Sequence, residues 1–175
     1  MNHMRGQHSG EPKAITKQKE MILYQSLQQA GITFEYQKYI PFAQCGLNSE
    51  TKHAFLDFLI PKQWGYIIVE CDENQHASYD PSCDVRRDFD IVAAVTLGSA
   101  HKLKIIHFNP DAYKINGITR TTSQKDRLKK LLEIMEEEPK SFERVFLFYD
   151  SLENATLPNI AESWNPLARD VSSIG

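Results

Sequence analysis

The sequence lacks any apolar run long enough to cross a membrane, and it contains little cysteine. None of its hydrophobic stretches approaches the roughly 18 consecutive apolar residues that a spanning helix needs. No apolar stretch follows the polar N-terminus, as a secretory signal would require. The three cysteines, Cys45, Cys71 and Cys83, are an odd number without the spacing of a disulfide framework. We therefore expect an intracellular protein of the cytoplasm or nucleus, neither secreted nor bound to a membrane.

The chain also lacks the net positive charge typical of nucleic-acid-binding proteins, because its formal net charge is −3. The charges are nevertheless segregated along the chain. Residues 50–100 contain nine Asp/Glu against four Lys/Arg, whereas residues 101–130 contain eight Lys/Arg against two Asp. This order fits a cation site followed by a phosphate-binding surface, and it fits equally well two solvated faces of opposite sign.

The length of 175 residues suits one domain with a sizeable core. We expect a disordered lead-in over residues 1–12, a folded domain over 13–150 and a weakly patterned tail over 151–175.

Hydrophobic periodicity and turn residues predict the secondary structure of the folded part. The predicted elements, in chain order, are a helix over 15–30, strands over 32–39, 54–60 and 66–72, a helix from Asp80-Pro81 to Gly98, a strand over 102–108, a helix beginning at the capping box Ser123-x-x-Asp126, and a strand over 144–149. This order predicts an α/β domain with a mixed central sheet flanked by helices.

Three acidic residues occupy apolar strands that we expect to be hairpin neighbours. Alternation of side chains puts Glu70 and Asp72 on one face of their strand, and Asp57 on one face with Phe55 and Leu59. Three adjacent carboxylates repel one another and are costly to bury, so a cation is expected beside them. Mg²⁺ or Mn²⁺ would satisfy this need through oxygen ligands. The alternative is that the acids form salt bridges to Lys or Arg, or reach solvent at the strand ends.

These residues also carry a resemblance to a known family. An Asp in one strand, followed by Glu-x-Lys at the end of the next, is the hallmark of the PD-(D/E)XK restriction-endonuclease-like superfamily. Its αβββαβ core resembles the order predicted over residues 15–108. The sequence is closer to the very-short-patch-repair-like branch, through Asp57-Phe58 and then Val69-Glu70-Cys71-Asp72-Glu73-Asn74-Gln75-His76.

A longer string of residues is similar to uncharacterised proteins of giant viruses and protists, over roughly residues 15–135. It comprises Asp72 to His76, Tyr79, Cys83 and Arg87, then Phe108-Asn109-Pro110-Asp111-x-Tyr113.

The resemblance implies a metal-dependent endonuclease that hydrolyses phosphodiester bonds, most often in DNA, and leaves a 5′-phosphate and a 3′-hydroxyl. The metal ligands implied for this chain are the three carboxylates of Asp57, Glu70 and Asp72, the backbone carbonyl of Cys71, and Glu20 from the first helix. Glu20 lies on the buried stripe of that helix with Leu23 and Leu27, although a glutamate there is equally explained by the helix dipole.

One position departs from the family pattern, because Asp72 stands where the catalytic lysine is usual. We expect a neighbouring side chain to take over the activation of water, with His76 as the first choice and Gln75 as the second. The structural alternative for His76 is a loop histidine that pairs with Asp80 or Asp84.

Basic residues after the site are candidates for contacts with nucleic acid. Arg87 or Arg86 could meet the scissile phosphate, although Arg87 could instead pair with Asp84 within its helix. Lys102 and Lys104 are expected on a surface that binds the phosphate backbone. DNA is the expected partner, RNA the alternative, and a homodimer is compatible with the sequence.

Two other functions remain open on the sequence. One is a catalytically silent nucleic-acid-binding module of the same fold, which the missing lysine favours. The other is an RNA endonuclease of the cap-snatching type, which uses a related core.

Overall fold

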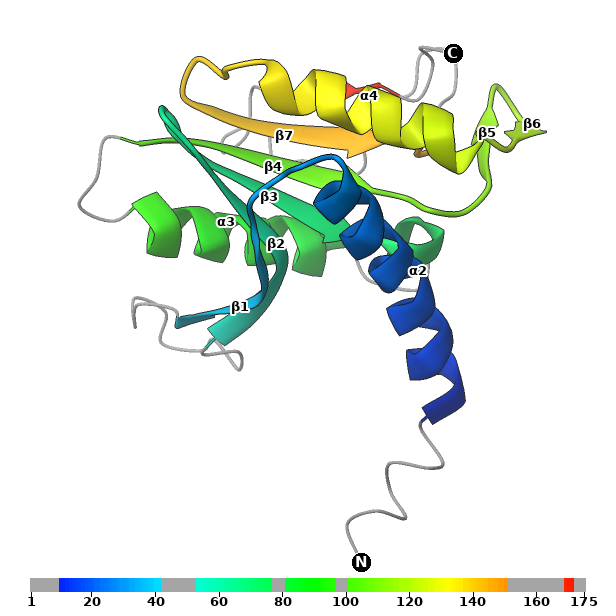
Figure 1. Ribbon diagram of the computed structural model, residues 1–175, viewed down its shortest axis with the longest axis horizontal. Helices are drawn as coiled ribbons and strands as arrows, with labels where there is room; N and C mark the ends of the chain where they lie inside the picture. The colour runs from blue at the N-terminus through cyan, green and yellow to red at the C-terminus, as the bar shows by residue number, and fades with distance from the viewer. Residues whose placement is uncertain (1–9, 42–52, 77–80, 97–100, 151–168, 172–175) are drawn as a thin grey trace, which may run out of the picture. The chain divides into compact units, whose positions relative to one another are not determined.

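The structure is a computed structural model that describes residues 10–41, 53–76, 81–96, 101–150 and 169–171 (Figure 1). The chain divides into two compact units, residues 1–32 and 33–175. The first unit contains the helix α2 (Gly10–Gln29), whose first residues belong to the segment expected as a lead-in. Gly31 follows with a φ of 77°, a left-handed conformation that glycine adopts without steric cost, so the helix ends where the sequence predicts.

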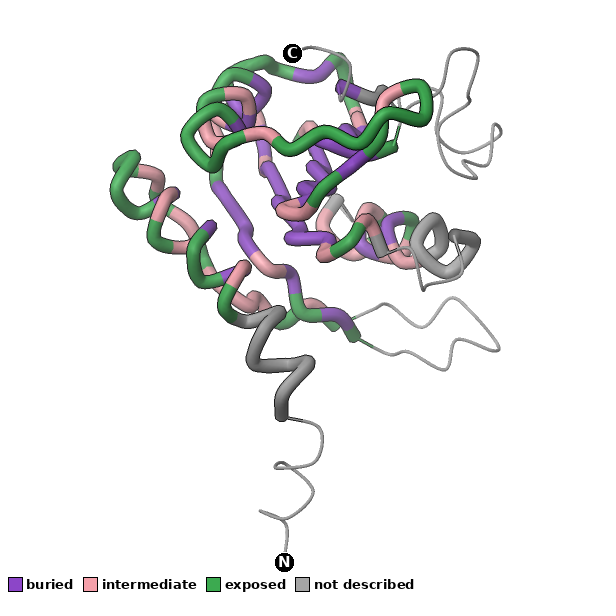
Figure 2. The backbone as a smooth tube through the Cα atoms, turned by 90° about the vertical axis from the view of Figure 1, so that its right-hand side faces the viewer, coloured by how far each residue is buried: buried purple, intermediate pink, exposed green. Residues whose placement is uncertain are grey.

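The second unit is built on a six-stranded mixed sheet in the order β1-β2-β3-β4-β7-β8 (Figure 1). The strands are β1 (Glu35–Pro41), β2 (His53–Lys62), β3 (Gly65–Cys71), β4 (Lys102–Phe108), β7 (Phe142–Leu147) and β8 (Arg169–Asp170). The first three strands form an antiparallel meander, and β3, β4, β7 and β8 run parallel to one another. Figure 2 shows the central strands as largely buried.

The connection between β2 and β3 sets the register of the two strands that carry the predicted acids. Gly65 begins β3 with a φ of 152°, and a Cβ at this position would lie 2.0 Å from the backbone oxygen of Lys102. Only glycine fits so close an approach of two backbones. The resulting register pairs Phe58 with Val69, so Asp57 and Glu70 are the residues that follow the last printed pair in the two strands, and the backbone N–H of Asp57 donates to the side chain of Glu70.

The helices α3 (Pro81–Thr96) and α4 (Gln124–Glu136) cover opposite faces of the sheet (Figure 1). Ile91 of α3 packs into a core cluster with strand residues that include Ile68 and Ile105. The neighbouring residue Lys104 points to the other face and reaches the end of α4. Ser123 caps α4 by accepting a hydrogen bond from the backbone of Asp126, as the capping box predicts. The expected mixed sheet flanked by helices is confirmed.

A short hairpin between β4 and α4 was not predicted from the sequence. It consists of β5 (Tyr113–Ile115) and β6 (Ile118–Arg120), which form a separate two-stranded sheet in the described part of the chain. Asn116 and Gly117 form its turn with φ values of 50° and 81°. An Asn-Gly pair between apolar residues is a strong signal for a hairpin, and hydrophobic periodicity alone does not reveal it.

None of the helices in the described part of the chain combines the length and the apolar character needed to cross a membrane.

Candidate functional site

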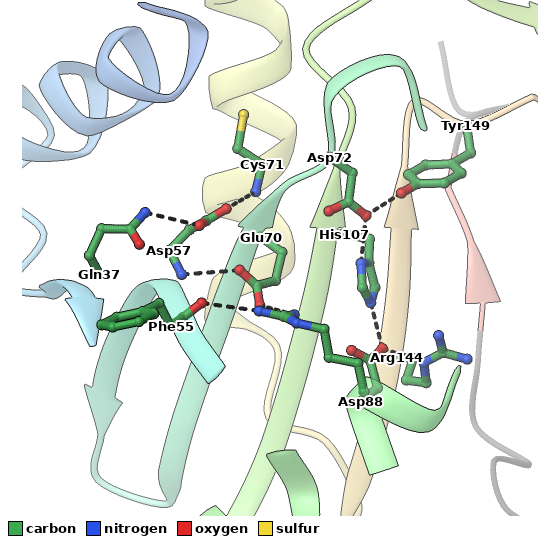
Figure 3. Close-up of polar contacts among 11 residues, drawn as sticks. Gln37, Phe55, Asp57, Glu70, Cys71, Asp72, Asp88, His107, Arg144 and Tyr149 are labelled. Atoms are coloured by element: carbon green, nitrogen blue, oxygen red, sulfur yellow. Dashed lines mark hydrogen bonds and ion pairs between the residues drawn. The ribbon is translucent and has the colours of Figure 1, made fainter. Parts of the chain in front are cut away.

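Asp57 and Glu70 lie on neighbouring strands at the end of the β2–β3 ladder, and the side chain of each contacts the backbone of the other strand (Figure 3). The backbone N–H of Asp57 donates to Oε2 of Glu70 at 3.0 Å, and the backbone N–H of Cys71 donates to Oδ2 of Asp57 at 2.8 Å. Each carboxylate thus accepts a backbone hydrogen bond from the opposite strand. The two side chains satisfy backbone amides at the point where the regular ladder stops, and these hydrogen bonds fix the orientation of each carboxylate.

The alternation of side chains between the two faces of β2 is interrupted near Asp57. Leu56 before it and Leu59 after it pack into the same core cluster, although regular alternation would place them on opposite faces. The expectation that Phe55, Asp57 and Leu59 share a face is therefore wrong, since Phe55 is 49% exposed and Leu59 is buried. The residue opposite Asp57 in β1 is Gln37, which has a φ of 51° and donates from Nε2 to Oδ1 of Asp57 at 3.2 Å. β1 and β2 both depart from regular strand geometry at this point, and the side chain of Asp57 accepts a hydrogen bond from the backbone N–H of Cys71.

A cation from α3 already contacts Glu70. Nη1 of Arg87 lies 2.5 Å from Oε1 of Glu70, and Nη2 donates to the carbonyl of Phe55 at 3.0 Å. Burial alone would lower the pKa of Arg87, but the charge of Glu70 outweighs this effect and raises that pKa, so the guanidinium stays charged. The salt bridge that the sequence left open as an alternative is thus present for Glu70.

Asp72 does not join the two other acids. Its Oδ2 lies 2.6 Å from Nδ1 of His107 in β4 and accepts a further hydrogen bond from the hydroxyl of Tyr149 (Figure 3). β3 ends at Cys71, so Asp72 already belongs to the turn that follows. Within the described ranges, no group of three or more His, Cys, Asp and Glu side chains could hold a metal ion. The sequence predicted a cluster of three carboxylates. In the structure, Asp57 and Glu70 lie on neighbouring strands, and Asp72 lies apart from them in an ion pair with His107.

The network of ion pairs around Asp72 extends through His107 to Asp88 of α3 and Arg144 of β7 (Figure 3). Nε2 of His107 lies 2.5 Å from Oδ2 of Asp88, which also accepts from Nε of Arg144 at 2.8 Å. Burial would lower the pKa of His107, but Asp88 and then Asp72 outweigh it and raise that pKa to about 10. Burial would raise the pKa of Asp88, but His107 and Arg144 outweigh it and lower that pKa. Two carboxylates and two cations therefore neutralise one another in the core.

Sequence reasoning missed His107, Asp88, Arg144 and Tyr149 as members of this network. A signal was present, because His107 stands between apolar residues of β4, and Arg144 precedes an apolar run in β7. Polar residues of this kind are buried only when hydrogen-bond or ion-pair partners satisfy them, so each one indicates that such a partner lies beside it.

The segment after β3 contains the residues expected to activate water. Gln75 has a φ of 58° and exchanges two hydrogen bonds with Asp150, from its Nε2 at 2.8 Å and to its Oε1 from the backbone at 2.6 Å. Its amide is thereby directed at the chain after β7. The side chain of His76 lies outside the described residues, as does that of Arg86. Glu20 belongs to the other compact unit, and its role as a ligand stays a prediction.

The loop after β4 supports the segment after β3. The backbone N–H of Asn74 donates to Oδ2 of Asp111 at 2.6 Å. Arg127 of α4, which is buried, holds this loop by donating to the carbonyls of Asn109 at 2.6 Å and Asp111 at 2.9 Å. The Asn109-Pro110-Asp111 motif therefore has a structural role.

The two lysines expected on a phosphate-binding surface have other roles. Lys104 is completely buried, and its Nζ donates to the carbonyls of Ile134, at 2.7 Å, and Glu137 at the end of α4. The expectation that it contacts nucleic acid is wrong, because alternation along β4 puts it beneath α4. Lys102 is half-buried and pairs with Glu138 at 2.6 Å.

Comparison of the chain with known proteins gives no match to a family model, a curated protein or a solved structure. Function is therefore inferred from the residues and their geometry.

Proposed function

We propose that this protein is a metal-dependent endonuclease of the PD-(D/E)XK type that hydrolyses phosphodiester bonds in DNA, with Mg²⁺ or Mn²⁺ as its cofactor. The observation that carries the proposal is the placement of Asp57 and Glu70 on neighbouring strands at the end of the β2–β3 ladder, where each carboxylate accepts a backbone hydrogen bond from the other strand. Two carboxylates are a sufficient protein contribution for Mg²⁺, which usually keeps several waters and contacts substrate phosphate.

The order of elements supports the same proposal. A helix, three antiparallel strands, a helix and a strand parallel to the third follow one another as α2, β1, β2, β3, α3 and β4. This is the order of the αβββαβ core. Asp57 lies in the second strand and Glu70 near the end of the third, where the family pattern has its two acids.

The charges of the pair also favour a divalent cation. Asp57 and Glu70 together carry two negative charges, and Arg87 supplies one positive charge. Asp57 accepts hydrogen bonds from the backbone N–H of Cys71 and the side-chain amide of Gln37. A carboxylate oxygen has two lone pairs, and carboxylate oxygens are the ligands that Mg²⁺ prefers.

Bound by Asp57 and Glu70, a divalent cation would supply Lewis-acid chemistry, activating water and neutralising charge on the phosphate. The side chain of Arg87 is 36% exposed and could therefore turn from Glu70 to the phosphate, to which it can donate two parallel hydrogen bonds. Asp72 pairs with His107, and a carboxylate supplies no positive charge in place of the missing lysine. His76 therefore remains the residue proposed to orient or deprotonate the water.

A second candidate function is a catalytically silent nucleic-acid-binding module. The contact of 2.5 Å between Arg87 and Glu70 favours it, because this ion pair neutralises Glu70 without any metal.

A cleavage assay separates these candidates. Single-stranded DNA, double-stranded DNA and RNA are incubated with the protein in Mg²⁺, in Mn²⁺ and in EDTA. We expect metal-dependent cleavage of DNA, lost in Asp57→Asn and Glu70→Gln and retained in Glu136→Gln, which alters an exposed glutamate of α4. Binding without cleavage in any metal supports the silent module, and preferential cleavage of RNA supports the alternative substrate. Undiminished cleavage by Asp57→Asn would rule out the proposed site.

A further inference from the structure

A cavity of about 510 Å³ lies between the β5–β6 hairpin and α4. Its lining comes from both strands of the hairpin, from the residues that join β6 to α4, from α4 itself, and from Phe148 after β7. Figure 1 shows the hairpin beside the first turn of α4. Cavities that bind small molecules have volumes of about 300–1,000 Å³, so this one has room for a ligand of nucleotide size. We call it the hairpin cavity.

The hairpin cavity has more positive than negative side chains. Arg120, Lys129 and Lys130 line it, together with Asp126 and Glu133. Lys130 pairs with Glu133 at 3.4 Å, whereas no residue in the described part of the chain forms an ion pair with Arg120 or Lys129. Asp126 balances only one of these two charges. The excess of positive charge favours an anion over a metal ion as the occupant.

The two cations without an ion pair come from the basic segment that the sequence shows over residues 101–130. Folding accounts for other cations of this segment, because they bind partners within the protein. These are Lys102, Lys104 and Arg127. Arg120 and Lys129 instead line one concave space, where charges of the same sign reinforce each other's potential.

The other lining residues match the remaining parts of a nucleotide. Residues 121–123, Thr-Thr-Ser, carry hydroxyl groups, which together with Arg and Lys commonly bind phosphate and sugar oxygens. Tyr113 and Phe148 contribute two aromatic rings with centroids 5.7 Å apart. Arg127 packs over both rings and donates to the carbonyl of Asn109, so the aromatic part of the lining is held in place.

We infer that the hairpin cavity binds a phosphate-bearing ligand of nucleotide size, and that Arg120 and Lys129 contact the phosphate. The guanidinium of Arg120 can donate two parallel hydrogen bonds to phosphate oxygens, and the ammonium of Lys129 adds a point charge. The phosphate can come from a free nucleotide or from the backbone of a nucleic acid, since its chemistry is the same in both. None of the lining residues belongs to the carboxylate pair, so the inference does not depend on the proposed function.

The inference is tested by isothermal titration calorimetry in EDTA, where a metal site cannot contribute. The probes are adenosine monophosphate, adenosine without a phosphate, and a short single-stranded oligonucleotide. We expect adenosine monophosphate to bind at least about tenfold more tightly than adenosine, because charge-assisted hydrogen bonds to phosphate contribute to its affinity. Displacement of the oligonucleotide by adenosine monophosphate identifies the nucleic-acid backbone as a source of the phosphate. Binding of the nucleotide without the oligonucleotide identifies free nucleotides.

Matched variants locate the binding in the hairpin cavity. Arg120→Gln and Lys129→Gln should each weaken the binding of adenosine monophosphate by about tenfold. Lys140→Gln removes an exposed lysine between α4 and β7 that does not line the cavity, and it should change the affinity by less than about twofold. All three positions are exposed, and thermal unfolding verifies that each variant folds.

The outcomes distinguish this inference from the proposed function. Metal-dependent cleavage of DNA without any binding of adenosine monophosphate or oligonucleotide in EDTA overturns the inference alone. Binding that depends on Arg120, without cleavage of any substrate, supports the inference and contradicts the proposed function. The inference is also overturned if adenosine and adenosine monophosphate bind with equal affinity, or if Arg120→Gln binds the nucleotide as tightly as Lys140→Gln does.

Discussion

Arg87 and Glu70 form an ion pair of 2.5 Å in which the side chain of Glu70 is only 4% exposed and the side chain of Arg87 is 36% exposed. The proposed function assigns the buried partner to the metal and the more accessible partner to the substrate phosphate. The pair therefore compensates the charge of Glu70 when no metal or phosphate is bound. Metal and Arg87 should compete for the same carboxylate.

The first prediction concerns Arg87→Gln. Without nucleic acid, this variant should bind Mn²⁺ about tenfold more tightly than the wild type, because Glu70 no longer has a competing cation. Without metal, it should be less stable, because a buried carboxylate loses its partner. Isothermal titration calorimetry and thermal unfolding measure the two effects. Lys102→Gln removes a cation paired with Glu138 and is the control. Weaker binding of Mn²⁺ by Arg87→Gln contradicts the competition.

The second prediction separates the roles of Asp72 and Glu70. Asp72→Asn should lower the free energy of unfolding by about 3 kcal/mol, because it leaves the buried cation His107 with one carboxylate fewer. Its affinity for Mn²⁺ should match that of the wild type, whereas Glu70→Gln should lose metal binding. Urea denaturation and calorimetry measure these quantities. Loss of metal binding in Asp72→Asn, with stability unchanged, would restore Asp72 as a ligand.

The third prediction is a loss of stability at alkaline pH. The pKa of His107 is raised from 6.5 to about 10 in the folded protein, so the folded state holds a proton that the unfolded state releases. The stabilisation from His107 is complete below about pH 6.5, and it decreases between pH 6.5 and 10 by about 1.4 kcal/mol per pH unit. Urea denaturation across this range measures the slope. His107→Gln should be less stable with a flatter profile, and equal slopes in the two proteins contradict the assignment.

The fourth prediction distinguishes a buried lysine from an exposed one. Lys104→Met should lower the free energy of unfolding by about 1–3 kcal/mol, because two carbonyls at the end of α4 lose their donor. Its affinity for DNA should be unchanged. Lys129→Met, on the exposed side of α4, should leave stability unchanged and is the matched control. Lower DNA affinity in Lys104→Met, with the fold intact, contradicts the structural role of Lys104.

The sequence by itself predicted the main helices and strands of the domain, and it placed Asp57 and Glu70 on neighbouring strands. Glycine and proline fix where the chain turns, and alternation marks the buried strands, so β4 agrees with its predicted bounds of 102–108. Asp57 and Glu70 could be placed together because a tight connection between antiparallel strands dictates which residues stand opposite each other. Asn116 and Gly117 also indicate the turn of the β5–β6 hairpin, although hydrophobic periodicity did not predict its strands.

Only the tertiary structure decided which partner each charged side chain has. Spacing along a strand shows the face on which a side chain lies, but it does not show which helix or strand packs against that face. Asp72 was expected beside Glu70, yet it contacts His107, which β4 brings alongside from 35 residues further along the chain. Lys104 was expected at the surface, yet α4 covers it. Local residues set the pattern of faces, and the packing of distant elements determined which charged side chains neutralise one another.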